Sequence, residues 1–335
     1  MIYQNLELHN ITEIQEGAAL GMTAIYRVPR SVRNALGARG RFISEEGTGA
    51  EIRFVTDAPH VRITLCAPET AGHITVFKGG NLHSQHRLEA GHVHTLHLEA
   101  PPLLQEVGRG RLLQSGFAPE VWRIGIGRHT VLFGGVQTFG KPLRPPAPGE
   151  TPPLRWLAYG SSITHGLTAY PSSYIHQAAR RLAADVYNLG LSGSCHCEPE
   201  MGDFLASRSD WDIATLELGV NMRGGFTVEQ FQERTSYLIN TIVDRHPDKP
   251  VFLITMFPNS ATYAENEIAH KARAFNEVLR GHVRRLDRST VQLIEGDAIL
   301  TDMSGLSCDM LHPGEYGHML MGENLARCLK AKTDT

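Results

Sequence analysis

The sequence predicts two domains of different fold class, an all-β domain followed by an α/β domain. A segment with six prolines, KPLRPPAPGETPP (141–153), interrupts the 335-residue chain. Before it, short runs alternate apolar and polar residues, which is the pattern of half-buried strands. After it, continuous apolar runs alternate with segments of helical spacing, which is typical of a parallel sheet covered on both faces. We therefore place the domains at 1–140 and 154–335, with 141–153 as an extended linker.

The first domain is predicted to be a β-sandwich of jelly-roll type. In HVRITLC (60–66), apolar residues occupy every second position, and HITVF (73–77) and HTLHL (94–98) have the same habit. KGGN (78–81) carries turn residues between two such runs. Because no helical period runs through 40–136, the many short strands favour a sandwich or jelly roll.

The second domain is predicted to have three layers around a parallel five-stranded sheet. Apolar residues have helical spacing between Ile175 and Leu182, which predicts one helix. A second is predicted from the spacing of Ile268, Phe275, Leu279 and Leu286. Thr227 and Gln230 have the spacing of a capping box at the start of another helix. The strands are expected at LRWLAY (154–159), DVYNL (185–189), IATLEL (213–218), VFLIT (251–255) and VQLI (291–294).

Composition excludes several classes of partner. The formal charge is -3, which gives no electrostatic reason to expect nucleic acid or an anionic membrane. The chain has neither the start of a signal peptide nor an apolar run long enough to span a membrane. Five cysteines disfavour a disulfide framework. We expect a cytoplasmic protein without nucleic-acid or membrane partners, and a homo-oligomer is left open.

Four polar loops follow the predicted strands or precede the last helix. They are GSSITHG (160–166), NLGLSG (188–193), GVNM (219–222) and DMLHP (309–313). In an open α/β sheet the carboxyl ends of the strands meet at one edge, where ligands bind. We therefore expect these loops to converge.

The converging residues suit acyl transfer. Ser162 lies at a strand-to-helix turn, where free N–H groups favour developing negative charge. His312 can take a hydroxyl proton near neutral pH, and Asp309 can orient its ring. Gly193 allows close approach of a backbone N–H, and the Asn221 amide can supply a further donor. Each residue alone could be a cap or turn residue.

The four loops resemble the conserved blocks of SGNH (GDSL-type) hydrolases, whose catalytic domain is flavodoxin-like. The resemblance covers about 154–330 and implies that Ser162 is the nucleophile, with His312 and Asp309 completing a triad. It also implies an oxyanion hole formed by Ser162, Gly193 and Asn221. The domain order is similar to that of some carbohydrate esterases and of a branch with a polyketide-tailoring acyltransferase.

The chain departs from the family pattern at two positions. Ser161 and Met222 stand where the family usually has aspartate, which predicts altered hydrogen bonding in the loops. We expect these two residues, together with His165 and Arg223, to border the substrate pocket.

A metal site is the main alternative interpretation of the histidine-rich sequence. Cys195-His196-Cys197 is a cluster of soft ligands, but no second cluster lies at a recognisable spacing. We therefore expect no metal and no organic cofactor.

The resemblance implies a serine esterase acting on short acyl esters. We expect an acetyl ester of a carbohydrate-like alcohol, so the partner would be a small-molecule or oligosaccharide ester. Two alternatives stay open: an acyltransferase with an alcohol acceptor, and a catalytically dead carbohydrate-binding protein.

Overall fold

The computed structural model describes residues 1–167 and 171–333. Residues 168–170 and 334–335, which belong to the predicted α/β domain, lie outside the described residues. The chain forms two compact units. The β unit comprises Met1–Arg30, Ser44–Pro153 and Ala183–Tyr187, and the α/β unit comprises Ser31–Ile43, Leu154–Leu182 and Asn188–Thr335.

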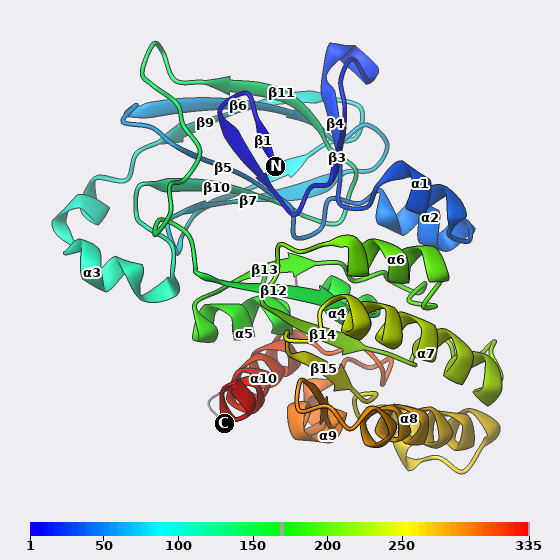
Figure 1. Ribbon diagram of the computed structural model, residues 1–335. Helices are drawn as coiled ribbons and strands as arrows, with labels where there is room; N and C mark the ends of the chain where they lie inside the picture. The colour runs from blue at the N-terminus through cyan, green and yellow to red at the C-terminus, as the bar shows by residue number, and fades with distance from the viewer. Residues whose placement is uncertain (168–170, 334–335) are drawn as a thin grey trace. The chain divides into compact units, whose positions relative to one another are not determined.

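Two antiparallel sheets build the β unit, which confirms the predicted sandwich (Figure 1). The first sheet has the order β1 (Ile2–Tyr3), β2 (Leu6–His9), β5 (Glu51–Val55), β10 (Val121–Ile126), β7 (Gly72–Lys78) and β8 (Asn81–Leu88). The second has the order β3 (Glu13–Gln15), β4 (Thr23–Tyr26), β11 (Leu132–Gln137), β6 (His60–Cys66) and β9 (Val93–Glu99). The short helix α3 (Arg109–Leu112) precedes β10.

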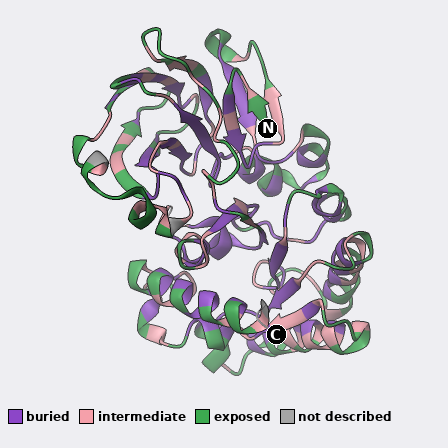
Figure 2. Cartoon of the chain, turned by 60° about the vertical axis from the view of Figure 1, so that its left-hand side comes forward, coloured by how far each residue is buried: buried purple, intermediate pink, exposed green. Residues whose placement is uncertain are grey.

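Alternating side chains account for the core of this unit. In β6, Val61, Ile63 and Leu65 are buried in one hydrophobic cluster, and Trp122 of β10 stacks near Phe54 of β5 in the same cluster. Figure 2 shows the strands mostly in the colour of buried residues. Each such large apolar side chain contributes about 1.5–3 kcal/mol on burial, so the period of two read from the sequence is the source of the sandwich.

The proline-rich segment is attached to the β unit by hydrogen bonds. Arg144 exchanges both backbone hydrogen bonds with Val55, at 2.8 and 3.1 Å, and its guanidinium holds Glu150 in a bidentate pair. Arg144 is not a proline, so it keeps the N–H that Pro145 and Pro146 lack. The segment 141–153 therefore differs from the extended linker that its composition suggested.

Two short segments belong to a different unit from the segments that flank them in the sequence. Most of helix α1 (Arg30–Ala35) and most of α2 (Ala38–Ser44) belong to the α/β unit, although they lie between two strands of the sandwich. Conversely, most of strand β13 (Ala184–Asn188) has its contacts in the β unit. One domain boundary is predicted from the sequence, at 141–153, and a single boundary does not account for these two exchanged segments.

The predicted five-stranded parallel sheet is present, which confirms the second fold class; four of its strands lie in the α/β unit, and most of β13 groups with the β unit. The order is β13, β12 (Leu154–Tyr159), β14 (Ile213–Glu217), β15 (Val251–Ile254) and β16 (Val291–Ile294). These strands match the five apolar runs to within one residue at each end. The order reverses at β12, so its carboxyl end is a topological switch point.

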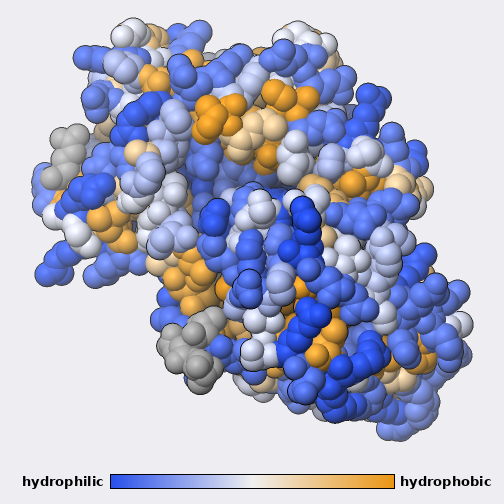
Figure 3. All heavy atoms as spheres, viewed as in Figure 1, coloured by the Kyte–Doolittle hydropathy of each residue, from blue (hydrophilic) through white to orange (hydrophobic). Residues whose placement is uncertain are grey.

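Helices cover the two faces of this sheet. In Figure 1, α5 (Tyr174–Leu182) and α10 (Glu315–Thr333) pack together on one face, while α6 (Pro199–Ser207), α7 (Val228–Arg245) and α8 (Glu267–Leu286) follow one another on the other. The expected capping box of Thr227 and Gln230 is present. Helix α8 differs from the prediction at Ile268: this residue is one of the apolar residues that marked the helix, but it is 45% exposed. Its outer surface is mainly hydrophilic (Figure 3). The short helices are α4 (Ser162–His165) and α9 (Gly296–Ile299).

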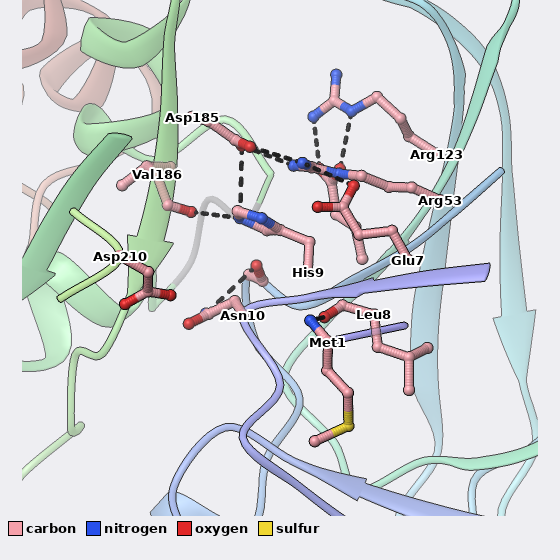
Figure 4. A network of polar contacts seen from close by, with 12 residues as sticks. Met1, Glu7, Leu8, His9, Asn10, Arg53, Arg123, Asp185, Val186 and Asp210 are labelled. Atoms are coloured by element: carbon pink, nitrogen blue, oxygen red, sulfur yellow. Dashed lines mark hydrogen bonds and ion pairs between the residues drawn. The ribbon is translucent and has the colours of Figure 1, made fainter. Parts of the chain in front are cut away.

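A buried ionic network runs through the β unit (Figure 4). Arg53 forms two 2.7 Å hydrogen bonds to Asp185 and a third to Glu51. Arg123 holds the same Glu51, and His9 bonds to the carbonyl of Val186. Burial alone would raise the pKa of Asp185, but the Arg53 guanidinium outweighs it and lowers that pKa. The network thereby ties strand β13 to the sandwich strands.

Asp185→Asn removes the carboxylate that accepts two hydrogen bonds from Arg53, which also pairs with Glu51 and Glu7. We expect the free energy of unfolding to fall by about 3 kcal/mol, because a buried charge that loses its partner is strongly destabilising. Urea unfolding measures the change. The matched control is Asp212→Asn, which breaks the partly exposed bidentate pair with Arg155 and should cost about 1 kcal/mol or less. Equal losses in the two variants would contradict the prediction.

Candidate active site

The loop after β12 presents Ser162 at the start of α4. The Ser161 hydroxyl accepts a hydrogen bond from the Ile163 N–H at 3.1 Å and so caps this helix. Gly166 ends the helix in the left-handed conformation, with φ of 87°. The serine that caps the helix is therefore Ser161 and not Ser162, which leaves the Ser162 hydroxyl available for another partner.

That partner is His312. Ser162 Oγ lies 2.8 Å from His312 Nε2, and His312 Nδ1 lies 2.6 Å from Asp309 Oδ2. Because an ionised carboxylate can only accept, Nδ1 carries the proton and Nε2 of the neutral ring is free to accept one from the serine. The three residues thus form a continuous hydrogen-bonded chain.

Asp309 is oriented by the loop that also carries His312. Its Oδ1 accepts the backbone N–H groups of Leu311 and His312 and the hydroxyl of Ser307. Desolvation acts to raise the pKa of Asp309, but these hydrogen bonds and the one from His312 together lower it well below its usual range. The carboxylate therefore stays ionised and can stabilise a positively charged imidazole.

The glycine loop runs beside the nucleophile loop. Leu191 donates its N–H to the carbonyl of Gly160 at 2.8 Å. At Gly190, an added Cβ would lie 2.3 Å from the backbone nitrogen of His165, so only glycine fits. Gly193 has a φ of 70° and is exposed, which leaves its N–H accessible.

The asparagine loop is attached to the glycine loop. Asn221 Oδ1 accepts the N–H of Cys195 at 3.1 Å. This bond fixes the orientation of the side-chain amide and leaves Nδ2 as a donor. The structure therefore brings together the loops of Ser162, Gly193 and Asn221, as their placement after neighbouring strands predicted.

The four residues expected to border the substrate pocket occupy different environments. The side chains of Ser161, His165 and Met222 lie in the interior, with exposures of 1, 0 and 0%. Ser162 itself is only 5% exposed, so the expectation that these residues border the substrate pocket stays a prediction. Arg223 is half-buried, and its Nη1 donates to Asn259 Oδ1 at 2.7 Å.

The described ranges contain neither a cluster of metal ligands nor a membrane-spanning helix. No group of three or more histidine, cysteine, aspartate or glutamate residues in 1–167 and 171–333 is placed to hold a metal ion. No helix in the same ranges is long and apolar enough to cross a membrane.

The comparison with protein families agrees with the site. Residues 155–330 match the model of the GDSL-like lipase/acylhydrolase family. The chain belongs to this family. No curated protein sequence matches the chain.

Several solved structures share the fold of this GDSL-like protein over both units. A salicylyl-acyltransferase, SsfX3, from a tetracycline biosynthetic pathway has a TM-score of 0.80 at 18% identity, covering 98% of this chain and 95% of that one. A family two carbohydrate esterase from Cellvibrio japonicus has a TM-score of 0.70 at 14% identity, covering 99% and 96%. A family two carbohydrate esterase from Clostridium thermocellum, in complex with cellohexaose, has a TM-score of 0.60 at 18% identity, covering 85% and 92%.

Sequence reasoning missed a buried carboxyl group behind the nucleophile loop of this GDSL-like chain. Glu217, 1% exposed at the end of β14, accepts the N–H of Ser161 at 2.7 Å and the hydroxyl of Thr164 at 3.1 Å. An added Cβ on Gly160 would lie 2.7 Å from its Oε2, so glycine there makes room for the carboxyl. The signal was present in the sequence, because Glu217 is the one charged residue in the apolar run IATLEL.

Glu217 is expected to make stability depend on pH. Burial raises its pKa from 4.5 to about 7, although the hydrogen bonds from Ser161 and Thr164 act in the opposite direction. In the unfolded chain the group ionises near its ordinary pKa. Between those values the folded state binds more protons than the unfolded state, so this group's contribution to stability falls as pH rises.

Glu217→Gln removes this titration. Relative to wild type, we expect the variant to gain roughly 2 kcal/mol in free energy of unfolding between pH 5 and pH 8. Urea unfolding at the two pH values tests it, and any constant offset from the substitution cancels. Glu295→Gln is the control, because hydrogen bonds from Arg280 lower the pKa of Glu295 and no such gain is expected. A flat difference for Glu217→Gln would refute the prediction.

Proposed function

We propose that this chain is a serine esterase that hydrolyses short acyl esters, acetyl esters above all, of a carbohydrate-like alcohol. The observation that carries the proposal is the hydrogen-bonded chain from Ser162 through His312 to Asp309. Membership of the GDSL-like lipase/acylhydrolase family supports the reaction class. The carbohydrate assignment draws on the solved carbohydrate esterases that share the fold.

The proposed acylation begins at Ser162. Ser162 Oγ attacks the ester carbonyl carbon while His312 Nε2 takes the hydroxyl proton. The carbonyl oxygen becomes an oxyanion, which the N–H groups of Ser162 and Gly193 and the amide of Asn221 stabilise. His312 then gives its proton to the leaving alcohol as the carbon–oxygen bond breaks, and the acyl group remains on Ser162.

Deacylation repeats the same chemistry with water. His312 removes a proton from a water molecule as its oxygen attacks the acyl-enzyme, and the proton returns to Ser162 as the acid leaves. Asp309 stays ionised throughout and stabilises the imidazolium that forms twice in the cycle. No metal or organic cofactor enters these steps.

Ser162→Ala tests the nucleophile. We expect kcat on p-nitrophenyl acetate to fall by about 10³-fold or more, because removing a triad member leaves only binding and oxyanion stabilisation. Labelling by a fluorophosphonate probe should also disappear. Ser161→Ala is the matched control: it removes a neighbouring hydroxyl that caps α4, at a cost of about 1 kcal/mol in stability, and should still be labelled. Wild-type turnover in Ser162→Ala would overturn the proposal.

A second candidate function is acyl transfer to an alcohol. It is favoured by the shared fold with the salicylyl-acyltransferase, which extends over 98% of this chain. The acyl-enzyme is the same, and only the nucleophile of the second step differs.

Product analysis with a competing alcohol separates the two functions. For an esterase, we expect released acid to equal released p-nitrophenol even when glucose is present in excess, because water is the acceptor. The measurement is chromatographic quantification of acid and new ester. An excess of acylated glucose over free acid would instead favour the transferase.

A further inference from the structure

An arginine from outside the four conserved loops lies beside the proposed oxyanion residues. Arg39, on α2, belongs to the α/β unit, and its Nε donates to the carbonyl of Ser192 at 3.3 Å. The same Nε lies 3.6 Å from the position that a Cβ would take on Gly193. Its guanidinium group also lies near the Phe42 ring, 6.0 Å from the ring centre. Arg39 is therefore held against the residue whose N–H we assign to the oxyanion.

A second arginine, Arg223, lies in the asparagine loop. It follows Asn221 by two residues, and Asn259 fixes its Nη1. The next residue, Ser260, donates its N–H to the carbonyl of Met310, within the loop that carries Asp309 and His312. Arg223 thus lies between the oxyanion loop and the triad loop.

Neither arginine has a carboxylate partner within residues 1–167 and 171–333. Arg39 contacts a carbonyl and a ring, and Arg223 contacts a neutral amide. Burial lowers the pKa of Arg223, and no nearby carboxylate offsets it. Arg223 is half-buried, and a half-buried cation without an anion is costly for the folded protein, whereas Arg39 is exposed and open to a ligand. Elsewhere in the chain, the buried Arg53 and the partly buried Arg280 are each held by carboxylates.

We infer that Arg39 and Arg223 form an anion subsite and that the natural ester carries a carboxylate within reach of it. This inference rests on the proposed esterase function and specifies its substrate class. A guanidinium presents several N–H donors in a planar fork that matches a carboxylate. The carboxylate can belong to the acyl group, as in a half-ester of a dicarboxylic acid, or to the alcohol, as in a uronic acid.

Two matched pairs of substrates distinguish these sources. The acyl pair is p-nitrophenyl hemisuccinate and p-nitrophenyl butyrate, and the alcohol pair is acetylated glucuronic acid and acetylated glucose. We expect kcat/KM of wild-type protein to favour the charged member of one pair by tenfold or more at low salt. The preference should shrink as ionic strength rises, because salt screens exposed charges.

Variants assign the preference to the two arginines. Arg39→Gln and Arg223→Gln should each reduce the charged-to-neutral ratio of kcat/KM by about tenfold, since each removes charge-assisted hydrogen bonds. Arg39→Glu should reduce it further. Arg284→Gln, an exposed arginine of α8 with the same change of charge, should leave the ratio unchanged. Because each ratio compares two substrates on one protein, a general loss of activity does not affect it.

The outcomes separate this inference from the proposed function. If Ser162-dependent hydrolysis occurs but neither charged ester is preferred, or Arg39→Gln and Arg223→Gln keep the wild-type ratio, the anion subsite is refuted and the esterase stands. If wild-type protein neither hydrolyses any ester nor reacts with a fluorophosphonate, the esterase fails first. Calorimetry with Ser162→Ala adds a readout without turnover: acetylated glucuronic acid should bind more tightly than acetylated glucose if the alcohol carries the charge.

Discussion

The hydrogen bond between Ser162 and His312 joins residues that are 150 positions apart in the chain. It forms because the loop after β12 and the loop before α10 both belong to the α/β unit, whose parallel strands end at a common edge. The glycine and asparagine loops depend on the same constraint. If the strand order changed, the serine, the imidazole and the amide donors would no longer meet, although every local motif would remain in the sequence.

The loops themselves are held in place by polar groups in the interior. Ser161 caps α4 while its N–H is bound by Glu217, and Gly160 leaves room for that carboxyl. The family's usual aspartate is absent at position 161, yet a carboxyl group is present behind the loop, supplied by the neighbouring strand β14. Position 161 thus lacks a carboxylate, but Glu217 supplies a carboxyl group to the same loop.

Charge is distributed unevenly around the proposed site. The whole chain has a formal charge of -3, but Arg39 and Arg223 flank the glycine and asparagine loops without carboxylate partners in the described residues. Arg39 comes from the helical segment inserted between two strands of the sandwich, which groups with the α/β unit. In the proposed anion subsite, one arginine therefore comes from outside residues 155–330, which match the family model.

The sequence by itself determined the two fold classes, the positions of the parallel strands to within a residue, and the residues of the four polar loops. These features depend on periodicity and on local chemistry, such as the alternation in 60–66 and the capping box at Thr227, which short stretches of chain contain. Only the tertiary structure decided that Ser161, His165 and Met222 face the interior, that 141–153 is bonded to the β unit, and that Arg39 lies beside Gly193. Those outcomes depend on which distant segments pack together, and no pattern within a single segment specifies its distant neighbours.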